Sequence, residues 1–284
     1  MDVLAVVCAV LGAASNAAGT AFQRKAASRV ARGGGLRFLA VLARDPAWLA
    51  GILGVTGAAL FQALALVLGP LALVQPVFVL ELPFALLIAA PLLHRRIPAA
   101  GWAGVAAVVG GLALFLACAA PTGADDQAPM SRWTPVLAGC LGAMALCVTA
   151  ARGRGPVFRA GALGTAAAIG NALTAALLKS ATGTFSDHGP AAFLTAWQTY
   201  GFALTGIAAV LLLENALQAG PLVASQPALT IGDAVVSLLL GIVLFGETIR
   251  TGLLLIPELL AVALVATGVV TLVRAVPNIR ETPH

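Results

Sequence analysis

The chain has 284 residues, of which 60% are hydrophobic and 10% are charged, with a net charge of +5 and a mean hydropathy of +1.00. This composition excludes a water-soluble domain, because even a well-buried fold needs a polar surface. It predicts a polytopic membrane protein whose main partner is the lipid bilayer. Nucleic-acid binding is not expected, since the distribution of the basic residues is explained by membrane topology.

Nine apolar runs are each long enough for a membrane-spanning helix, which needs about 20 residues. They give an all-α fold, because a transmembrane β-barrel would show alternation instead of continuous apolar runs. The apolar stretch within segment 23–46 is too short and too basic to cross the membrane. We therefore predict that this segment is an amphipathic helix on the membrane surface. In chain order the predicted spans are 3–22, 47–68, 71–93, 98–118, 133–151, 160–178, 193–217, 222–245 and 252–273.

Successive loops of a nine-span protein fall on alternate sides of the membrane. One side then holds 13 of the 16 Lys and Arg residues, and the other keeps Arg132, Lys179 and Arg250. Basic loops remain in the cytoplasm under the positive-inside rule. We therefore predict a plasma-membrane protein with its N-terminus outside and its C-terminus in the cytoplasm.

An internal repeat divides the chain. Residues 69–76 (GPLALVQP) return 151 positions later as 220–227 (GPLVASQP), with five of eight positions identical. The flanking helices also correspond, whereas the span 133–151 has no counterpart. Because four helices return the chain to its starting side, one extra helix delivers the second half upside down. Such inverted repeats are typical of transporters whose site lies between the halves.

The repeat predicts three parts. The first transmembrane repeat covers 1–120 and includes the amphipathic segment 23–46. A linking loop and the unpaired helix occupy 121–155. The second, inverted repeat covers 156–284. The first and last parts are called the first half and the second half below.

Four carboxylates lie within the predicted spans, where a charge costs about 3 kcal/mol or more and usually serves an ion or substrate pathway. Glu81 and Asp233 are the eleventh and twelfth residues of their spans, and the repeat places them in nearly equivalent positions. We predict that they form the substrate or ion site. Glu214 and Glu258 lie nearer the ends of their spans and are further candidates. The alternative is a neutral acid bonded within the core.

Amides complete the polar set. In lipid they join helices more often than they bind solutes, but a symmetric pair is a stronger candidate for binding. Lys179 should end its helix and extend its ammonium to the outer interface. Prolines within the spans, such as Pro76, free a backbone carbonyl and so predict cavities or hinges. The candidate amides are Asn16, Asn171, Gln62, Gln75 and Gln226.

No enzyme is expected. The histidines His94, His188 and His284 lack metal or nucleophile partners at useful spacing, and neither Gly-x-Ser-x-Gly nor His-Glu-x-x-His occurs. A scaffold or receptor would leave the midplane acids without a role. No cofactor is predicted, and a homodimer is one arrangement that the chain could adopt.

The basic segment after the first helix, the Gly69-Pro70 turn with its Gln75-Pro76 helix start, and the segment 244–248 (LFGET) together resemble the drug/metabolite transporter superfamily with its EamA repeat. The nine-helix plan with an outside N-terminus is similar to the NIPA-like magnesium transporters. In one place the chain departs from the pattern. The first half ends in 93–96 (LHRR) where the pattern has an acid, which favours capping or interfacial pairing for the equivalent Glu247.

The resemblance implies transport of magnesium or a similar divalent cation. Such ions need oxygen ligands, and magnesium keeps its waters while contacting one or two carboxylates. Glu81 and Asp233 would be those metal ligands, with magnesium as the transported ion. The alternative is a proton-coupled exporter of a small polar metabolite or amino acid, because two midplane acids also suit proton coupling.

The topology gives the first testable prediction. Single cysteines placed in the loop Asp125–Asp126 should react with an impermeant thiol reagent added outside intact cells, after the four native cysteines are replaced. Cysteines in the loop Arg152–Arg159 should react only after the membrane is opened. Labelling of both loops from the same side would contradict the nine-span topology.

Overall fold

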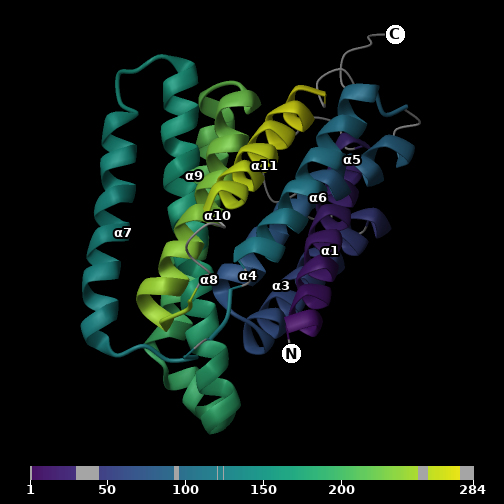
Figure 1. Cartoon of the computed structure of the whole chain (residues 1–284). Coiled ribbons are helices and arrows are strands. Elements are labelled where there is room, and N and C mark those ends of the chain that lie inside the picture. The colour runs from purple at the N-terminus through teal and green to yellow at the C-terminus, as the bar shows by residue number, and fades with distance from the viewer. Residues whose placement is uncertain are drawn as a thin grey trace.

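The computed structural model describes residues 2–29, 45–92, 96–119, 121–123, 125–248 and 255–275. Across these ranges the chain is helical without a strand, and Thr122 and Thr248 form an isolated antiparallel bridge. Nine helical segments in the described part are long and apolar enough to cross a membrane, which confirms the predicted class. The elements are α1 (Asp2–Arg29), α3 (Pro46–Leu68), α4 (Leu71–Val77), η1 (Phe78–Leu80), α5 (Glu81–Leu92), α6 (Ala99–Ala119), α7 (Met130–Ala150), α8 (Pro156–Thr195), α9 (Trp197–Ala219), α10 (Leu222–Phe245) and α11 (Leu255–Ala275) (Figure 1).

The predicted amphipathic segment 23–46 falls mostly outside the described residues. Its first residues continue α1 as far as Arg29, and its last residue opens α3. The side chain of Asp45 accepts hydrogen bonds from Ala47 N and Trp48 N at 2.7 and 3.4 Å, which caps α3 from within the first half.

The prediction for the sixth span is wrong at its end. Instead of stopping at residue 178, the helix continues, and α8 spans the 40 residues Pro156–Thr195 with one kink near its end. Residues such as Lys179 and Asp187 make this stretch too polar for a span, but they do not prevent a helix. The break comes at Gly189, whose φ of 79° lies in the left-handed region that favours glycine.

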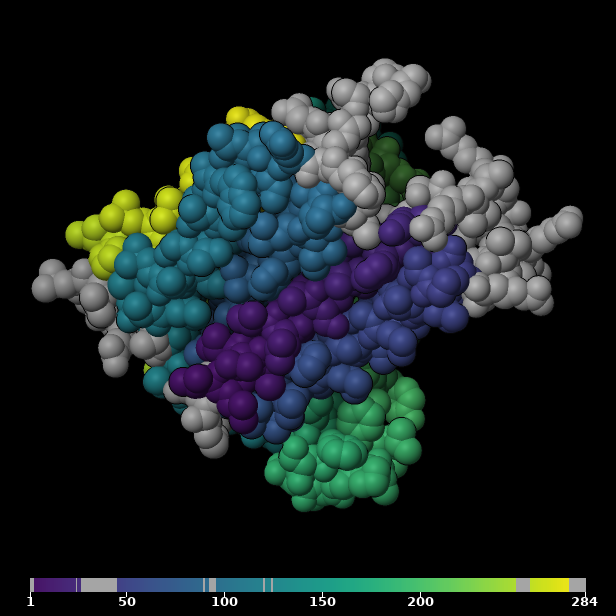
Figure 2. Space-filling view, turned by 90° about the vertical axis from the view of Figure 1, so that its right-hand side faces the viewer, coloured from purple at the N-terminus to yellow at the C-terminus, as the bar shows by residue number. Residues whose placement is uncertain are grey.

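The two ends of the helix bundle are named from the chain. The N-side is the end where α1 begins, and the C-side is the end where α11 finishes (Figure 1). The distal part of α8, by which we mean its C-terminal end, projects beyond the other helices at the N-side (Figures 1 and 2).

Small residues set the helix pairs. A side chain at Gly51 would collide with the carbonyl oxygen of Gly19, so α1 and α3 pack backbone to backbone. Gly111 lies equally close to Ala261 and Val265, which brings together α6 and α11, the last helices of the two halves. In the second half α8 packs against both α9 and α10. Close approach of this kind is the usual way to join helices in lipid, where the hydrophobic effect does not drive association.

The two Gly-Pro turns have the same backbone geometry. Pro70 and Pro221 have φ/ψ of −66°/147° and −68°/143°, and each opens the following helix. Gly69 packs against Ala5 near the start of α1, and Gly220 packs against Pro156 at the start of α8. The sequence repeat is thus a structural repeat at these turns. The inverted orientation of the halves stays a prediction.

Candidate functional site

Glu81 and Asp233 lie at the middle of their spans. Asp233 is the twelfth of the 24 residues of α10, and Glu81 opens α5 directly after η1. Leu80 and Leu82 beside Glu81, and Ala234 beside Asp233, pack against one cluster of buried apolar side chains. The carboxyl of Asp233 lies within electrostatic range of Glu81. The structure therefore brings the two predicted residues into one neighbourhood.

The orientation of Asp233 follows from helical periodicity. Val235, Leu239 and Val243 are the exposed large residues on the lipid-facing side of α10. At 100° per residue, Asp233 and Ser237 fall on the opposite face. Ser237 is buried, and its hydroxyl donates to Asp233 Oδ1 at 3.3 Å. Asp233 is thus half-buried and points away from the most exposed side of α10.

The third span is irregular where it reaches Glu81. Pro76 cannot donate to the helical ladder, and α4 ends at Val77 before the short 3₁₀ turn η1. The equivalent Pro227 leaves α10 continuous. The predicted association of proline with a cavity therefore holds for Pro76, which lines the pocket described below, whereas Pro227 does not line it.

A pocket of about 60 Å³ lies between α4–η1, α6, α10 and α11, and neither Glu81 nor Asp233 lines it. It is bounded by helices of both halves and has room for only a few water molecules. Thr230 is its one polar side chain. The lining residues are Pro76, Val79, Leu112, Phe115, Thr230, Ile231, Ala234, Val235, Leu238, Val262 and Val265.

The other two predicted carboxylates occupy different settings. Glu214 is exposed on α9, where its neighbour Asn215 donates to the carbonyl of Leu211. Glu258 is buried in the first turn of α11, and its Oε1 has no hydrogen-bond partner among the described residues. It shares a helix face with Val262 and Val265, which line the pocket. Glu258 is thus a neighbour of the pocket, whereas Glu214 is not.

None of the five predicted amides lines the pocket. Gln75 is buried in α4 with an unpartnered Nε2, while the side chains of the other four are half-buried. Within the described ranges no group of three or more His, Cys, Asp or Glu side chains could hold a metal.

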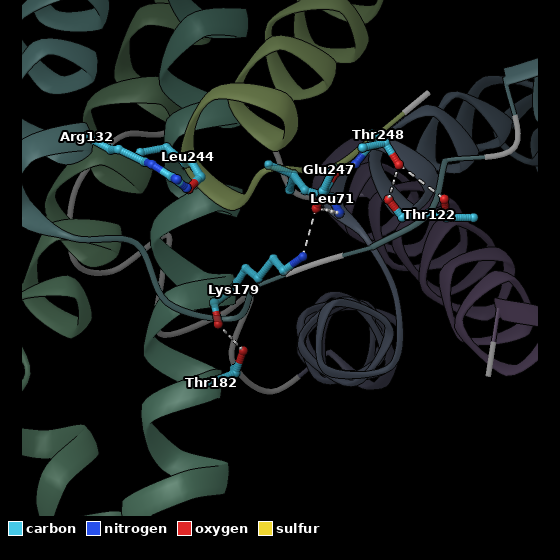
Figure 3. A network of polar contacts seen from close by, with 9 residues as sticks. Leu71, Thr122, Arg132, Lys179, Thr182, Leu244, Glu247 and Thr248 are labelled. Carbon is cyan, nitrogen blue, oxygen red and sulfur yellow. Dashed lines mark hydrogen bonds and ion pairs between the residues drawn. The ribbon is translucent and has the colours of Figure 1, made fainter. Parts of the chain in front are cut away.

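The prediction for Lys179 is wrong. Its ammonium does not extend to the interface but is fully buried inside the bundle, 2.8 Å from Glu247 Oε1 and 4.7 Å from the ring centre of Phe245. Figure 3 shows Lys179 reaching from α8 toward Glu247. The misreading has a simple cause: α8 does not end there, and the elements around it cover the side chain.

Glu247 has the capping and pairing role that the sequence favoured. Its two carboxylate oxygens accept hydrogen bonds from Leu71 N at 2.6 Å and Ala72 N at 2.7 Å. These are free N–H groups of the first turn of α4, and Pro70 before them supplies no side-chain cap. Glu247 thus caps a helix of the first half while it pairs with a lysine of the second half.

Gly246 and Gly241 make this position available to Glu247. Gly246 adopts the left-handed conformation with φ of 63°, and the N–H groups of Gly246 and Glu247 both meet the carbonyl of Gly241. A side chain at Gly241 would collide with the Glu247 carboxylate. The LFGET segment is therefore a helix ending that directs an acid back into the protein.

The linking loop closes over the same helix ending. Arg132 donates to the carbonyl of Leu244 at 3.0 Å (Figure 3). The N–H of Asp125 donates to the carbonyl of Phe245 at 3.2 Å. Asp126 packs against Gly183, one turn beyond Lys179. Asp126 is exposed, but partial desolvation by its neighbours raises the pKa of its carboxyl above the usual value, and the ammonium of Lys179 opposes that rise. The loop thus holds a second acid close to the ion pair.

The chain is 31% identical to an uncharacterised protein of Corynebacterium glutamicum over 253 residues, which cover 87% of this chain and 86% of that relative. The two proteins belong to one family. No protein-family model and no solved structure matches the chain.

The ion pair gives the second prediction. Lys179→Met or Glu247→Gln should each lower the free energy of unfolding in detergent by about 3 kcal/mol, because either change leaves a buried polar group without its partner. The double variant should lose clearly less than the sum. The exposed Glu214→Gln should stay within about 0.5 kcal/mol of the parent. Strict additivity of the two single changes would show that the pair is not energetically coupled.

Proposed function

We propose that the chain is a membrane transporter whose substrate or coupling ion binds at Glu81 and Asp233. The proposal rests on one observation: two carboxylates at the middle of apolar spans lie within electrostatic range of each other. Like charges in such a place repel and are poorly solvated. A transported cation or a cycling proton would offset that cost. A non-transporting scaffold would give the pair no role.

The first candidate is magnesium or a similar divalent cation, with the chain as a NIPA-like member of the drug/metabolite transporter superfamily. Two carboxylates and retained waters suit magnesium, which seldom occupies a full protein cage. The pocket, with room for only a few waters, suits a small ion better than a planar drug. The sequence resemblance points the same way.

The second candidate is a proton-coupled exporter of a small polar metabolite or amino acid. The nearly apolar lining of the pocket favours it, since such walls offer a hydrated ion few oxygen ligands. The buried Glu258 with its unpartnered oxygen could then carry a proton. In both candidates the same carboxylates are essential.

The third prediction concerns these carboxylates. Glu81→Gln and Asp233→Asn should each reduce transport in proteoliposomes at least tenfold, because the charge that attracts the ion or proton is gone. The folded protein should still be recovered, since both changes keep shape and most hydrogen bonding. Asp187→Asn, a change of an exposed acid on the distal part of α8, should transport normally. Normal transport by both midplane variants would place the site elsewhere.

The fourth prediction separates the two candidates. A magnesium ion crossing the membrane carries two charges, so a uniport route gains about 4.6 kcal/mol per 100 mV of negative interior potential. Proteoliposomes with potential and pH gradient set independently can measure this dependence. Magnesium entry driven by potential alone supports the first candidate. Solute movement that requires a pH gradient, without magnesium flux, would reject it in favour of the exporter.

A further inference from the structure

We infer that Glu247 and Lys179 form a latch that closes the N-side of the transport path. By the latch we mean the carboxylate of Glu247, the ammonium of Lys179 and the N–H groups of Leu71 and Ala72. The inference rests on the proposed transport function for its purpose, but the closure itself can be measured without any substrate.

The latch crosses the boundary between the two halves. Leu71 and Ala72 belong to the first half, whereas Lys179 and Glu247 belong to the second. The packing of α6 on α11 and of α4 on α10 is made mainly by apolar side chains and glycine backbone. Such surfaces can shift by small steps, whereas a buried carboxylate is either bonded to its donors or not. The latch is therefore the two-state element at this boundary.

Opening the latch requires water. The N–H groups of Leu71 and Ala72 and the ammonium of Lys179 would all lose their acceptor if Glu247 moved away. Unpaired buried donors are costly, so they must be hydrated or find another acceptor. Separation of the latch and entry of water from the N-side thus occur together, as a gate requires.

The linking loop offers Lys179 an alternative partner. Asp126 interacts electrostatically with both Lys179 and Glu247, and its backbone lies against Gly183 on α8. Unlike Glu247, Asp126 is exposed. When Glu247 leaves, Lys179 can turn to this acid at the edge of the bundle. This exchange of partners lowers the cost of opening without removing the closed state.

The C-side lacks the corresponding carboxylate. α10 starts at Leu222 with the same Gly-Pro turn as α4, and its cap position Pro221 likewise supplies no side-chain hydrogen bond. In the repeat, however, the position of Glu247 is occupied by Arg96, which cannot accept hydrogen bonds. A latch of this chemistry therefore operates at the N-side alone, and the two entrances of the path are chemically different.

The test measures access to the pocket from each side. Leu238 lines the pocket and lies seven residues before the end of α10, roughly 10 Å from the N-side end at helical rise. In the full chain without native cysteines, Leu238→Cys is labelled in sealed vesicles by a charged methanethiosulfonate reagent added to one side at a time. We expect slow labelling from the N-side, and at least tenfold faster labelling in Glu247→Gln and in Lys179→Met. The rate from the C-side should change less than twofold.

Asp45→Ala is the matched control. It removes a carboxylate helix cap that stays within the first half, so it should lower stability without changing the labelling rate. Unchanged N-side labelling in folded Lys179→Met would overturn the latch, as would an equal rise in Asp45→Ala. If Glu247→Gln does not fold, the labelling rate of Lys179→Met tests the latch instead. A rise in labelling without any transport would keep the latch and reject the transporter.

Discussion

The buried contact between Glu247 and Lys179 ties together the parts of the molecule that surround the pocket. One carboxylate accepts the first two free N–H groups of α4, pairs with an ammonium of α8 and stands at the end of α10. In water such a group would contribute little, but in a low-dielectric interior its loss would leave three donors unpaired. The position of α4 depends on this contact, and α4 leads directly to η1 and Glu81.

The remaining helix contacts use a different principle. α1 with α3 and α6 with α11 approach so closely that glycine backbone forms the interface. This geometry gives dispersion contacts over a long surface, to which the hydroxyl of Ser15 adds a hydrogen bond to the carbonyl of Gly54 at 2.8 Å. The bundle therefore combines broad apolar interfaces with a group of polar contacts at the N-side, among which the Glu247–Lys179 contact is fully buried. We regard that combination as suitable for a protein whose halves must move without separating.

The third span shows how a local irregularity serves the site. Pro76 interrupts the helical ladder beside the pocket, and the chain resumes as α5 at Glu81. Its repeat partner Pro227 lies in a straight α10, so Asp233 is presented by a regular helix. The two carboxylates thus come from one broken and one continuous helix. Proline at equivalent positions has different consequences because the surrounding packing differs, and the packing decides whether the freed carbonyl is accommodated.

The sequence by itself determined the helical class, the nine apolar helices and the midspan positions of Glu81 and Asp233. These depend on composition, run length and repeat offset, which are properties of the chain read along its length. It also indicated a capping or pairing role for Glu247, because the first half has LHRR where the resembled pattern has an acid.

Only the tertiary structure decided the fate of Lys179, the length of α8 and the place of Glu214. Whether a lysine near the end of an apolar run reaches the interface or is buried depends on which elements cover it, and those come from residues 125–133 and 241–247. The part of α8 beyond residue 179 is helical without being continuously apolar. A search for apolar runs therefore could not predict that the helix continues there. Glu247 is separated by 68 positions in the chain from Lys179 and by 176 positions from Leu71. Contacts over such separations leave no periodic pattern in the sequence, and only folding brings the residues together.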